Sequence, residues 1–168
     1  MFPTLRSRLP VLALALVALC AAGVLPATAA SSDDNGRPHS MPAAALPTKG
    51  ERAARYAVEE VGVPYRWGGE SPSTGFDCSG LVRWAYEQVG IDLPHSSYAL
   101  YSEGRRVSGS NLAPGDLLFF EGLGHVGLYL GRGRMVHAPQ TGRDVEIVRL
   151  SGTNYGARMI GARRIVAA

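Results

Sequence analysis

The chain has 168 residues, 17 of them Lys or Arg and 14 Asp or Glu, for a formal net charge of +3 at pH 7. Without Arg6 and Arg8, which lie in an expected export signal, 15 basic residues face 14 acidic ones. So small an excess argues against a general polyanion-binding role, and no nucleic-acid partner is expected.

Residues 1 to 29 predict a secretory signal peptide. Arg6 and Arg8 form a basic start, Val11 to Val24 is apolar, and Ala27-Thr28-Ala29 is typical of a cleavage site. The apolar stretch is too short for a stable transmembrane helix. We therefore expect an exported protein with no membrane span once the signal is removed.

Residues 30 to 47 are rich in Ser, Asp, Asn, Gly and Pro, which predicts a flexible linker. The folded domain is expected to occupy residues 48 to 168, a length sufficient for one core. Its first helix should begin at Thr48, because Thr48 and Glu51 fit a capping box and apolar residues follow at helical spacing. Gly62 and Pro64 should end it.

The segment from Tyr65 to Phe76 is rich in Gly, Ser and Pro and predicts an irregular loop. Asp77 is a suitable N-cap for a second helix, which Gly90 should end. A short third helix is expected from about Ser97 to Glu103.

After a turn at residues 113 to 116, the pattern becomes extended. Helices followed by a meander of strands predict an α+β domain, with the N-terminal helices packed on a roughly five-stranded antiparallel sheet. The expected strands are Leu117–Phe120, Val126–Leu130, Met135–Ala138, Val145–Arg149 and Ala157–Ile165.

Cys78 is the one cysteine expected in the mature chain, because Cys20 lies within the signal. It occurs where a loop turns into a helix, and the N–H groups and dipole of a helix N-terminus lower the pKa of a thiol. This placement makes Cys78 a candidate nucleophile. A buried, inert cysteine is the alternative.

Two histidines fall on neighbouring strands of one expected hairpin, His125 and His137. A three-residue loop at Gly131-Arg132-Gly133 would pair Leu130 with Arg134 and make the histidines diagonal neighbours on one face. A two-residue loop would place them on opposite faces. The apolar residues sort cleanly onto the other face in the first register, which favours a shared site.

In that arrangement Cys78 would attack a carbonyl carbon, His125 would take the thiol proton, and His137 would orient the first imidazole. Binding of a zinc ion is the alternative role for a cysteine and several histidines. No Cys-x-x-Cys or His-x-x-x-His spacing is present, so no metal is expected. His39 and His95 lack this placement, and no catalytic role is expected for them.

Residues 50 to 166 resemble the NlpC (p60) family of papain-like cell-wall cysteine peptidases. The resemblance rests on four ordered motifs with compatible spacing. They are Tyr65-Arg66-Trp67-Gly68-Gly69, Phe76-Asp77-Cys78-Ser79-Gly80-Leu81-Val82, Pro114-Gly115-Asp116-Leu117-Leu118-Phe119-Phe120, and His125-Val126-Gly127-Leu128-Tyr129-Leu130 followed by His137.

The resemblance implies a papain-like fold with a Cys-His-His triad of Cys78, His125 and His137. It also implies that the Tyr65 hydroxyl and the Cys78 backbone N–H hold the oxyanion of the tetrahedral intermediate. Asp77 and Ser79 would line the substrate groove, although helix capping explains both equally well.

The function implied is hydrolysis of peptidoglycan stem peptides, at the bond between γ-D-glutamate and the following diamino acid. The enzyme would need no cofactor and would work in the periplasm or at the bacterial cell surface. Amidase action between muramic acid and L-alanine is one alternative, and a non-catalytic wall-binding module is another. A binding role alone would not require Tyr65 and the whole triad.

Overall fold

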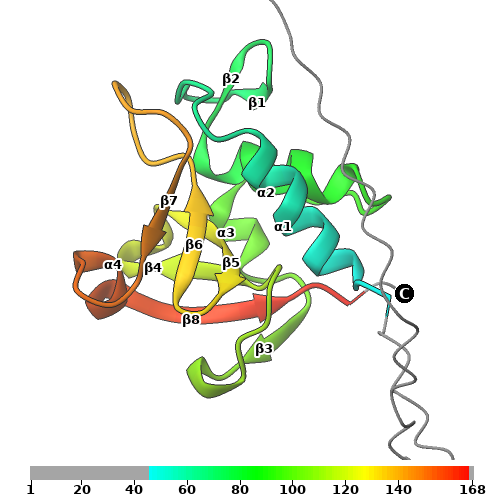
Figure 1. The fold of residues 1–168 in the computed structure, drawn as a ribbon, viewed down its shortest axis with the longest axis vertical. Coiled ribbons are helices and arrows are strands. Elements are labelled where there is room, and N and C mark those ends of the chain that lie inside the picture. The colour runs from blue at the N-terminus through cyan, green and yellow to red at the C-terminus, as the bar shows by residue number, and fades with distance from the viewer. Residues whose placement is uncertain (1–45, 167–168) are drawn as a thin grey trace, which may run out of the picture. The chain divides into compact units, whose positions relative to one another are not determined.

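The computed structural model describes residues 46 to 166, which form an α+β domain as predicted (Figure 1). The expected signal peptide and residues 30 to 45 of the expected linker lie outside the described residues. None of the described helices combines the length and the apolar character that crossing a membrane requires.

The helices begin where side-chain caps start them. α1 (Lys49–Glu59) carries the predicted capping box: Glu51 N–H donates to Thr48 Oγ1 at 3.1 Å, and Thr48 N–H donates to Glu51 Oε2 at 2.7 Å. α2 (Cys78–Glu87) begins directly after its predicted N-cap, Asp77. α3 (Ser97–Leu100) is capped by Ser96 and is shorter than predicted.

The main sheet is antiparallel, and its strands lie in the order β3-β8-β4-β5-β6-β7. Five of its strands match the predicted ones in position. The prediction of about five strands is corrected to six, because β3 also joins the sheet by pairing with β8. The strands are β3 (Arg105–Val107), β4 (Leu117–Phe120), β5 (Val126–Gly131), β6 (Arg134–His137), β7 (Glu146–Arg149) and β8 (Met159–Arg164).

Two short segments also differ from the prediction. The loop before Cys78 contains a small hairpin, β1 (Glu70–Ser71) and β2 (Gly75–Phe76). The start of the last predicted strand belongs instead to a short helix, α4 (Asn154–Arg158). Two single 3₁₀ turns occur at Gly109–Asn111 and Glu121–Leu123.

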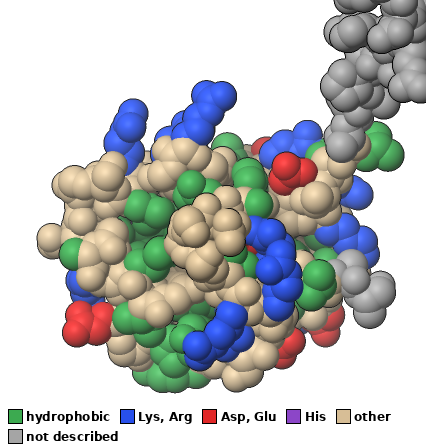
Figure 2. Space-filling view, turned by 90° about the horizontal axis from the view of Figure 1, so that it is seen from below, with side chains coloured by type: hydrophobic (Ala, Val, Ile, Leu, Met, Phe, Trp, Pro, Cys, Tyr) green, Lys and Arg blue, Asp and Glu red, His purple; other side chains and the backbone are tan. Residues whose placement is uncertain are grey.

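Two apolar layers sandwich the sheet. α1 and α2 contact β5 on one face (Figure 1), where Leu117 and Phe119 of β4 join their core. Leu118 and Phe120 of the same strand point the other way, into a smaller cluster. Lys and Arg side chains stand out from the face seen from below in Figure 2. The start of β5 lies at the N-terminus of α2, where the Val126 backbone hydrogen-bonds to Cys78.

Candidate active site

Cys78 lines a groove of about 540 Å³ together with Tyr65 and His125. It is the first residue of α2, and the buried side chains of Leu81 and Val82 hold that helix against the sheet. The thiol is half-buried. Residues predicted from three separate segments of the sequence therefore meet in one groove.

The two predicted histidines are in direct contact. His125 Nε2 lies 2.8 Å from His137 Nδ1, a hydrogen-bond distance. His137, on β6, is fully buried, whereas His125 precedes β5 and reaches the groove. With Nε2 of His125 engaged by His137, Nδ1 is the ring nitrogen left to exchange a proton in the groove.

The turn that aligns these histidines differs from the predicted one. Arg132 and Gly133, with φ of 54° and 66°, form a two-residue turn, and Gly131 rather than Leu130 pairs with Arg134. A register shift between Tyr129 and Gly131 then adds one residue to β5. This bulge restores the predicted register beyond the turn, so the histidines share a face despite the shorter loop.

A carboxylate lies beyond His137. Glu146 Oε1 of β7 is 3.4 Å from His137 Nε2, which is buried and makes no hydrogen bond of good geometry with any described residue. Arg143 binds the other oxygen of the same carboxylate. The rings of Tyr155 and His137 pack in a T-shaped arrangement, with their centroids 4.9 Å apart. Glu146 is thus placed to favour the His137 tautomer that carries its proton on Nε2 and accepts at Nδ1.

Burial is the largest influence on the pKa values of Cys78 and His125. It raises the pKa of the Cys78 thiol, and the hydrogen bond from the Val126 backbone offsets this only in part. Burial and then the neighbouring His137 lower the pKa of His125 to about 4. The expected lowering of the Cys78 pKa by the helix N-terminus is therefore wrong, because desolvation outweighs it. At neutral pH the groove holds a thiol beside a neutral imidazole.

Tyr65 enters the groove from the segment before β1. Its backbone N–H donates to the backbone carbonyl oxygen of Arg143 at 2.8 Å, and an isolated β-bridge joins Tyr65 to Phe76, two residues before Cys78. Burial, and then the charges of Cys78 and Asp77, raise the pKa of its hydroxyl. The hydroxyl consequently keeps its proton at neutral pH and remains a hydrogen-bond donor.

Asp77 and Ser79 are both buried at the start of α2. Asp77 Oδ1 accepts hydrogen bonds from Gly80 N–H at 2.7 Å and from Ser79 Oγ at 3.0 Å, and Oδ2 accepts from Gly68 N–H at 2.9 Å. His95 Nε2 lies 3.0 Å from the same Oδ1. The carboxylate therefore ties the second helix, the Tyr65 segment and the loop before α3 together.

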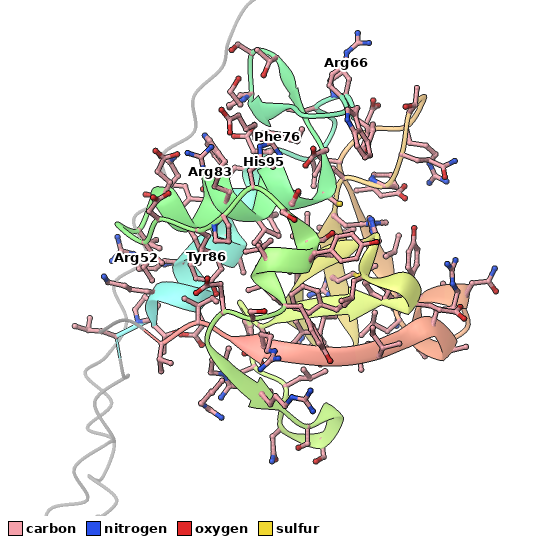
Figure 3. The ribbon with its side chains drawn as sticks, turned by 180° about the vertical axis from the view of Figure 1, so that it is seen from behind. Arg52, Arg66, Phe76, Arg83, Tyr86 and His95 are labelled. Atoms are coloured by element: carbon pink, nitrogen blue, oxygen red, sulfur yellow. The ribbon has the colours of Figure 1, made fainter. Side chains whose placement is uncertain are left out.

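His95 is a groove residue that the sequence reasoning missed. Besides Asp77 it contacts Glu70, whose carboxylate also pairs with Arg83. Figure 3 shows Arg83 of α2 and His95 near one another beside Phe76. No spacing rule along the chain connects His95 to Asp77, so the sequence carried no local signal for this contact. Among residues 46 to 166 no group of three or more His, Cys, Asp or Glu side chains could hold a metal ion.

Residues 62 to 164 match the family model described as the NlpC/P60 family. The chain belongs to this family. The match includes Cys78, His125 and His137, and the predicted resemblance and α+β fold class are confirmed.

Two named relatives extend the match. Probable endopeptidase Rv2190c of Mycobacterium tuberculosis is 50% identical over 114 residues, covering 65% of this chain and 29% of its own length. Murein DD-endopeptidase MepH of Escherichia coli is 41% identical over 117 residues, covering 65% of this chain and 43% of its own. The chain thus spans less than half of either relative.

The structure of the peptidoglycan hydrolase RipB from Mycobacterium tuberculosis superposes with a TM-score of 0.62 at 36% identity. The superposition covers 71% of this chain and 66% of RipB. At this identity the likeness extends to sequence as well as to fold.

Proposed function

We propose that the protein is an exported cysteine peptidase that hydrolyses peptidoglycan stem peptides at the bond between γ-D-glutamate and the diamino acid. The observation that carries this proposal is the shared groove of Cys78 and His125, with His125 Nε2 held 2.8 Å from His137 Nδ1. A nucleophile, a base and an orienting group in this order are the parts of an acyl-transfer site.

In the first half of the reaction, His125 Nδ1 takes the thiol proton as Cys78 Sγ bonds to the carbonyl carbon. Because the resting pair is neutral, proton transfer and attack are coupled rather than preceded by an ion pair. The Cys78 N–H and the Tyr65 hydroxyl stabilise the oxyanion. His125 then gives its proton to the departing amine, which leaves a thioester on Cys78.

In the second half, water attacks the thioester carbon and His125 Nδ1 takes a proton from that water. The tetrahedral intermediate collapses, the acid product leaves, and the proton returns to the Cys78 sulfur. His137 accepts from His125 Nε2–H throughout, which stabilises the transient imidazolium. Every proton in this cycle has a residue to carry it, so the cycle calls on no cofactor.

The choice of substrate rests on the family and its relatives. RipB is described as a peptidoglycan hydrolase, and MepH is named a murein DD-endopeptidase. Action on peptidoglycan implies work in the periplasm or at the cell surface, in agreement with the expected signal peptide. Asp77 and Ser79 remain proposed substrate-binding residues of the acyl side, although the oxygens of Asp77 already accept several protein donors.

Mass spectrometry of purified muropeptides incubated with the protein tests the bond. We expect fragments that end in D-glutamate, and none with the Cys78→Ala variant, because that variant keeps the fold but lacks the nucleophile. Released intact stem peptides would identify an amidase instead. Cleaved cross-links would identify a DD-endopeptidase, as the name of MepH suggests.

Uncleaved muropeptides with folded wild-type protein would contradict the enzymatic proposal. Co-sedimentation with insoluble peptidoglycan would then separate a wall-binding module from a protein with a different substrate.

The rate should persist well into the acid range. His125 must be neutral to accept the thiol proton, and its pKa is lowered to about 4. We therefore expect kcat/KM to change little between pH 7 and pH 5 and to fall as the pH drops through about 4. A pH profile of peptide hydrolysis measures this acid limb. A midpoint near the ordinary histidine value of about 6.5 would show that burial does not control the base.

A further inference from the structure

The edge strand β3 and its neighbour β8 bring four arginines together. Their antiparallel register places Arg105 opposite Arg164 and Arg106 opposite Arg163. β3 lies at one edge of the sheet, below β8 in Figure 1, and Figure 2 shows Lys and Arg side chains on this side of the molecule. Like charges directly opposite each other destabilise a strand pair. The small net charge of the chain therefore conceals a local concentration of positive charge.

Arg164 has its anion within the fold. Asp116 is buried and accepts from this guanidinium with both oxygens, Oδ1 from Nε at 2.6 Å and Oδ2 from Nη2 at 2.7 Å. This is the planar, two-bond geometry in which one guanidinium matches one carboxylate. The charge on this face of the two strands is therefore compensated by a residue of the protein itself.

Arg106 and Arg163 face the other side of the sheet, without such an anion. Val107 and Ala162, adjacent to them along the strands, belong to the smaller apolar cluster, so this arginine pair points the opposite way. No described carboxylate forms an ion pair with either arginine, and Glu103 is the one acidic residue between positions 93 and 115. Nε of Arg163 is also buried without a hydrogen-bond partner among the described residues. A partly buried charge without a partner costs free energy, which a bound anion would offset.

Arg163 is held in place before any ligand binds. Its Cζ lies 4.6 Å from the centroid of the Tyr101 ring, a cation–π contact. Tyr101 in turn packs in a T-shaped arrangement against the fully buried Phe119, with the ring centroids 5.1 Å apart. Arg106 is exposed and directly opposite Arg163 on the neighbouring strand, so both guanidinium groups can reach one anion.

Two guanidinium groups on one face suit a phosphate group better than a carboxylate. A carboxylate has two oxygens in one plane, and a single guanidinium satisfies them, as Arg164 does for Asp116. A phosphodiester is tetrahedral, so its oxygens point in different directions and accept from two guanidinium groups on neighbouring strands. The Arg106 and Arg163 pair therefore matches a phosphate.

The surroundings of the pair indicate which phosphate compound it binds. Residues 102 to 111 include no exposed large hydrophobic side chain that could enter a lipid bilayer. The Tyr101 ring is engaged by Arg163 and Phe119, so it offers no platform on which a nucleobase could stack. Arg105 is exposed and next to Arg106 in β3, and it presents a further cation on the opposite face of the strand. A phosphate polymer without bases that crosses this edge would contact both.

We propose that Arg106 and Arg163 form a phosphate-binding site for a linear phosphodiester polymer such as poly(glycerol phosphate). One phosphate lies between the two guanidinium groups, and the next phosphate along the polymer contacts Arg105. The site is separate from the Cys78 groove, because no residue of β3 or β8 lines that groove. Binding there holds the protein on the polymer whether or not hydrolysis occurs, so this inference does not rest on the proposed reaction.

Fluorescence anisotropy of labelled poly(glycerol phosphate), titrated with the whole protein, measures this binding. In Arg106→Gln we expect the dissociation constant to rise about tenfold, through the loss of one charge-assisted contact. In Arg163→Lys we expect a rise of about threefold, because lysine keeps the charge but lacks the planar fork of donors. An Arg163→Lys variant that binds as tightly as wild type would contradict the role of the guanidinium.

Arg149→Gln is the matched control, since it removes the same charge from an exposed position of β7, at the opposite edge of the sheet. It should change the dissociation constant by less than about twofold. A loss of affinity equal to that of Arg106→Gln would show diffuse attraction and overturn the site, as would no binding by folded wild type.

Two further ligands test the class of anion. Unlabelled polyglutamate should displace the labelled polymer only weakly, and displacement equal to that by unlabelled poly(glycerol phosphate) would refute the choice of phosphate. Co-sedimentation with phosphatidylglycerol vesicles should be weak in wild type and Arg106→Gln alike. Tight vesicle binding that is lost in Arg106→Gln would assign the site to a membrane surface and overturn the proposal.

Discussion

The His125→Ala variant is expected to hydrolyse peptide about 10⁴-fold more slowly than wild type, measured as kcat/KM. Burial raises the pKa of Cys78, so the thiol cannot supply its own thiolate at neutral pH. The variant keeps the proposed nucleophile and the proposed oxyanion donors but lacks the group proposed to take and return the proton. Residual hydrolysis should come only from positioning in the groove.

Two controls make this expectation specific. Added imidazole should restore part of the activity of His125→Ala but none to Cys78→Ala, because only the former lacks an imidazole. The variant that combines His125→Ala and Cys78→Ala should be no slower than the slower of the two single variants, because the effects of substituting residues that act as one unit are not additive. Activity of His125→Ala within tenfold of wild type, in protein with a native circular dichroism spectrum, would refute the role of His125 as base.

Asp77→Ala should lower the free energy of unfolding by about 2 to 4 kcal/mol, combining a lost N-cap with lost buried bonds to a charged group. The carboxylate accepts from Gly68, Ser79 and Gly80 and contacts His95, so one substitution releases both groove loops from α2. Urea denaturation at pH 7 measures the loss. Hydrolysis should also slow, since Cys78 begins the released helix.

Asp92→Ala is the matched control, because its carboxylate is 87% exposed and makes one long contact of 3.8 Å with Arg83. It should change the free energy of unfolding by less than about 0.5 kcal/mol. Burial tends to raise the pKa of Asp77, but the Gly80 N–H and His95 together hold it below its ordinary value. The cost of Asp77→Ala should thus shrink as acid protonates the wild-type carboxylate, and a cost independent of pH would contradict this account.

The helix starts and strand positions that depend on residues close in the sequence were predicted correctly. The Thr48 and Glu51 capping box and the Asp77 cap act within one helical turn, so the starts of α1 and α2 can be found from local chemistry. β4 was found because its four apolar residues follow a turn sequence. These signals depend on contacts between residues close in the chain.

Elements specified from a distance were missed or misjudged. β3 has exposed arginines and no apolar alternation, and it exists because β8 offers its backbone as a partner. The bulge at Leu130 could not be predicted from the pattern of apolar residues. It nevertheless places His125 and His137 on one face of the sheet despite a two-residue turn. His95 is held in the groove by Asp77, 18 residues earlier.

Residue type and short-range order predict a candidate nucleophile and two candidate histidines, and they identify the family and the fold class, because each depends on motifs that are read along the chain. Packing decides the protonation of the site, since burial raises the pKa of Cys78 and lowers that of His125 to about 4. It also decides which residues meet at the site, where His125 Nε2 lies 2.8 Å from His137 Nδ1 and His95 Nε2 lies 3.0 Å from Asp77 Oδ1. Desolvation and charge at such a site depend on which surfaces meet, and that is a property of the folded chain alone.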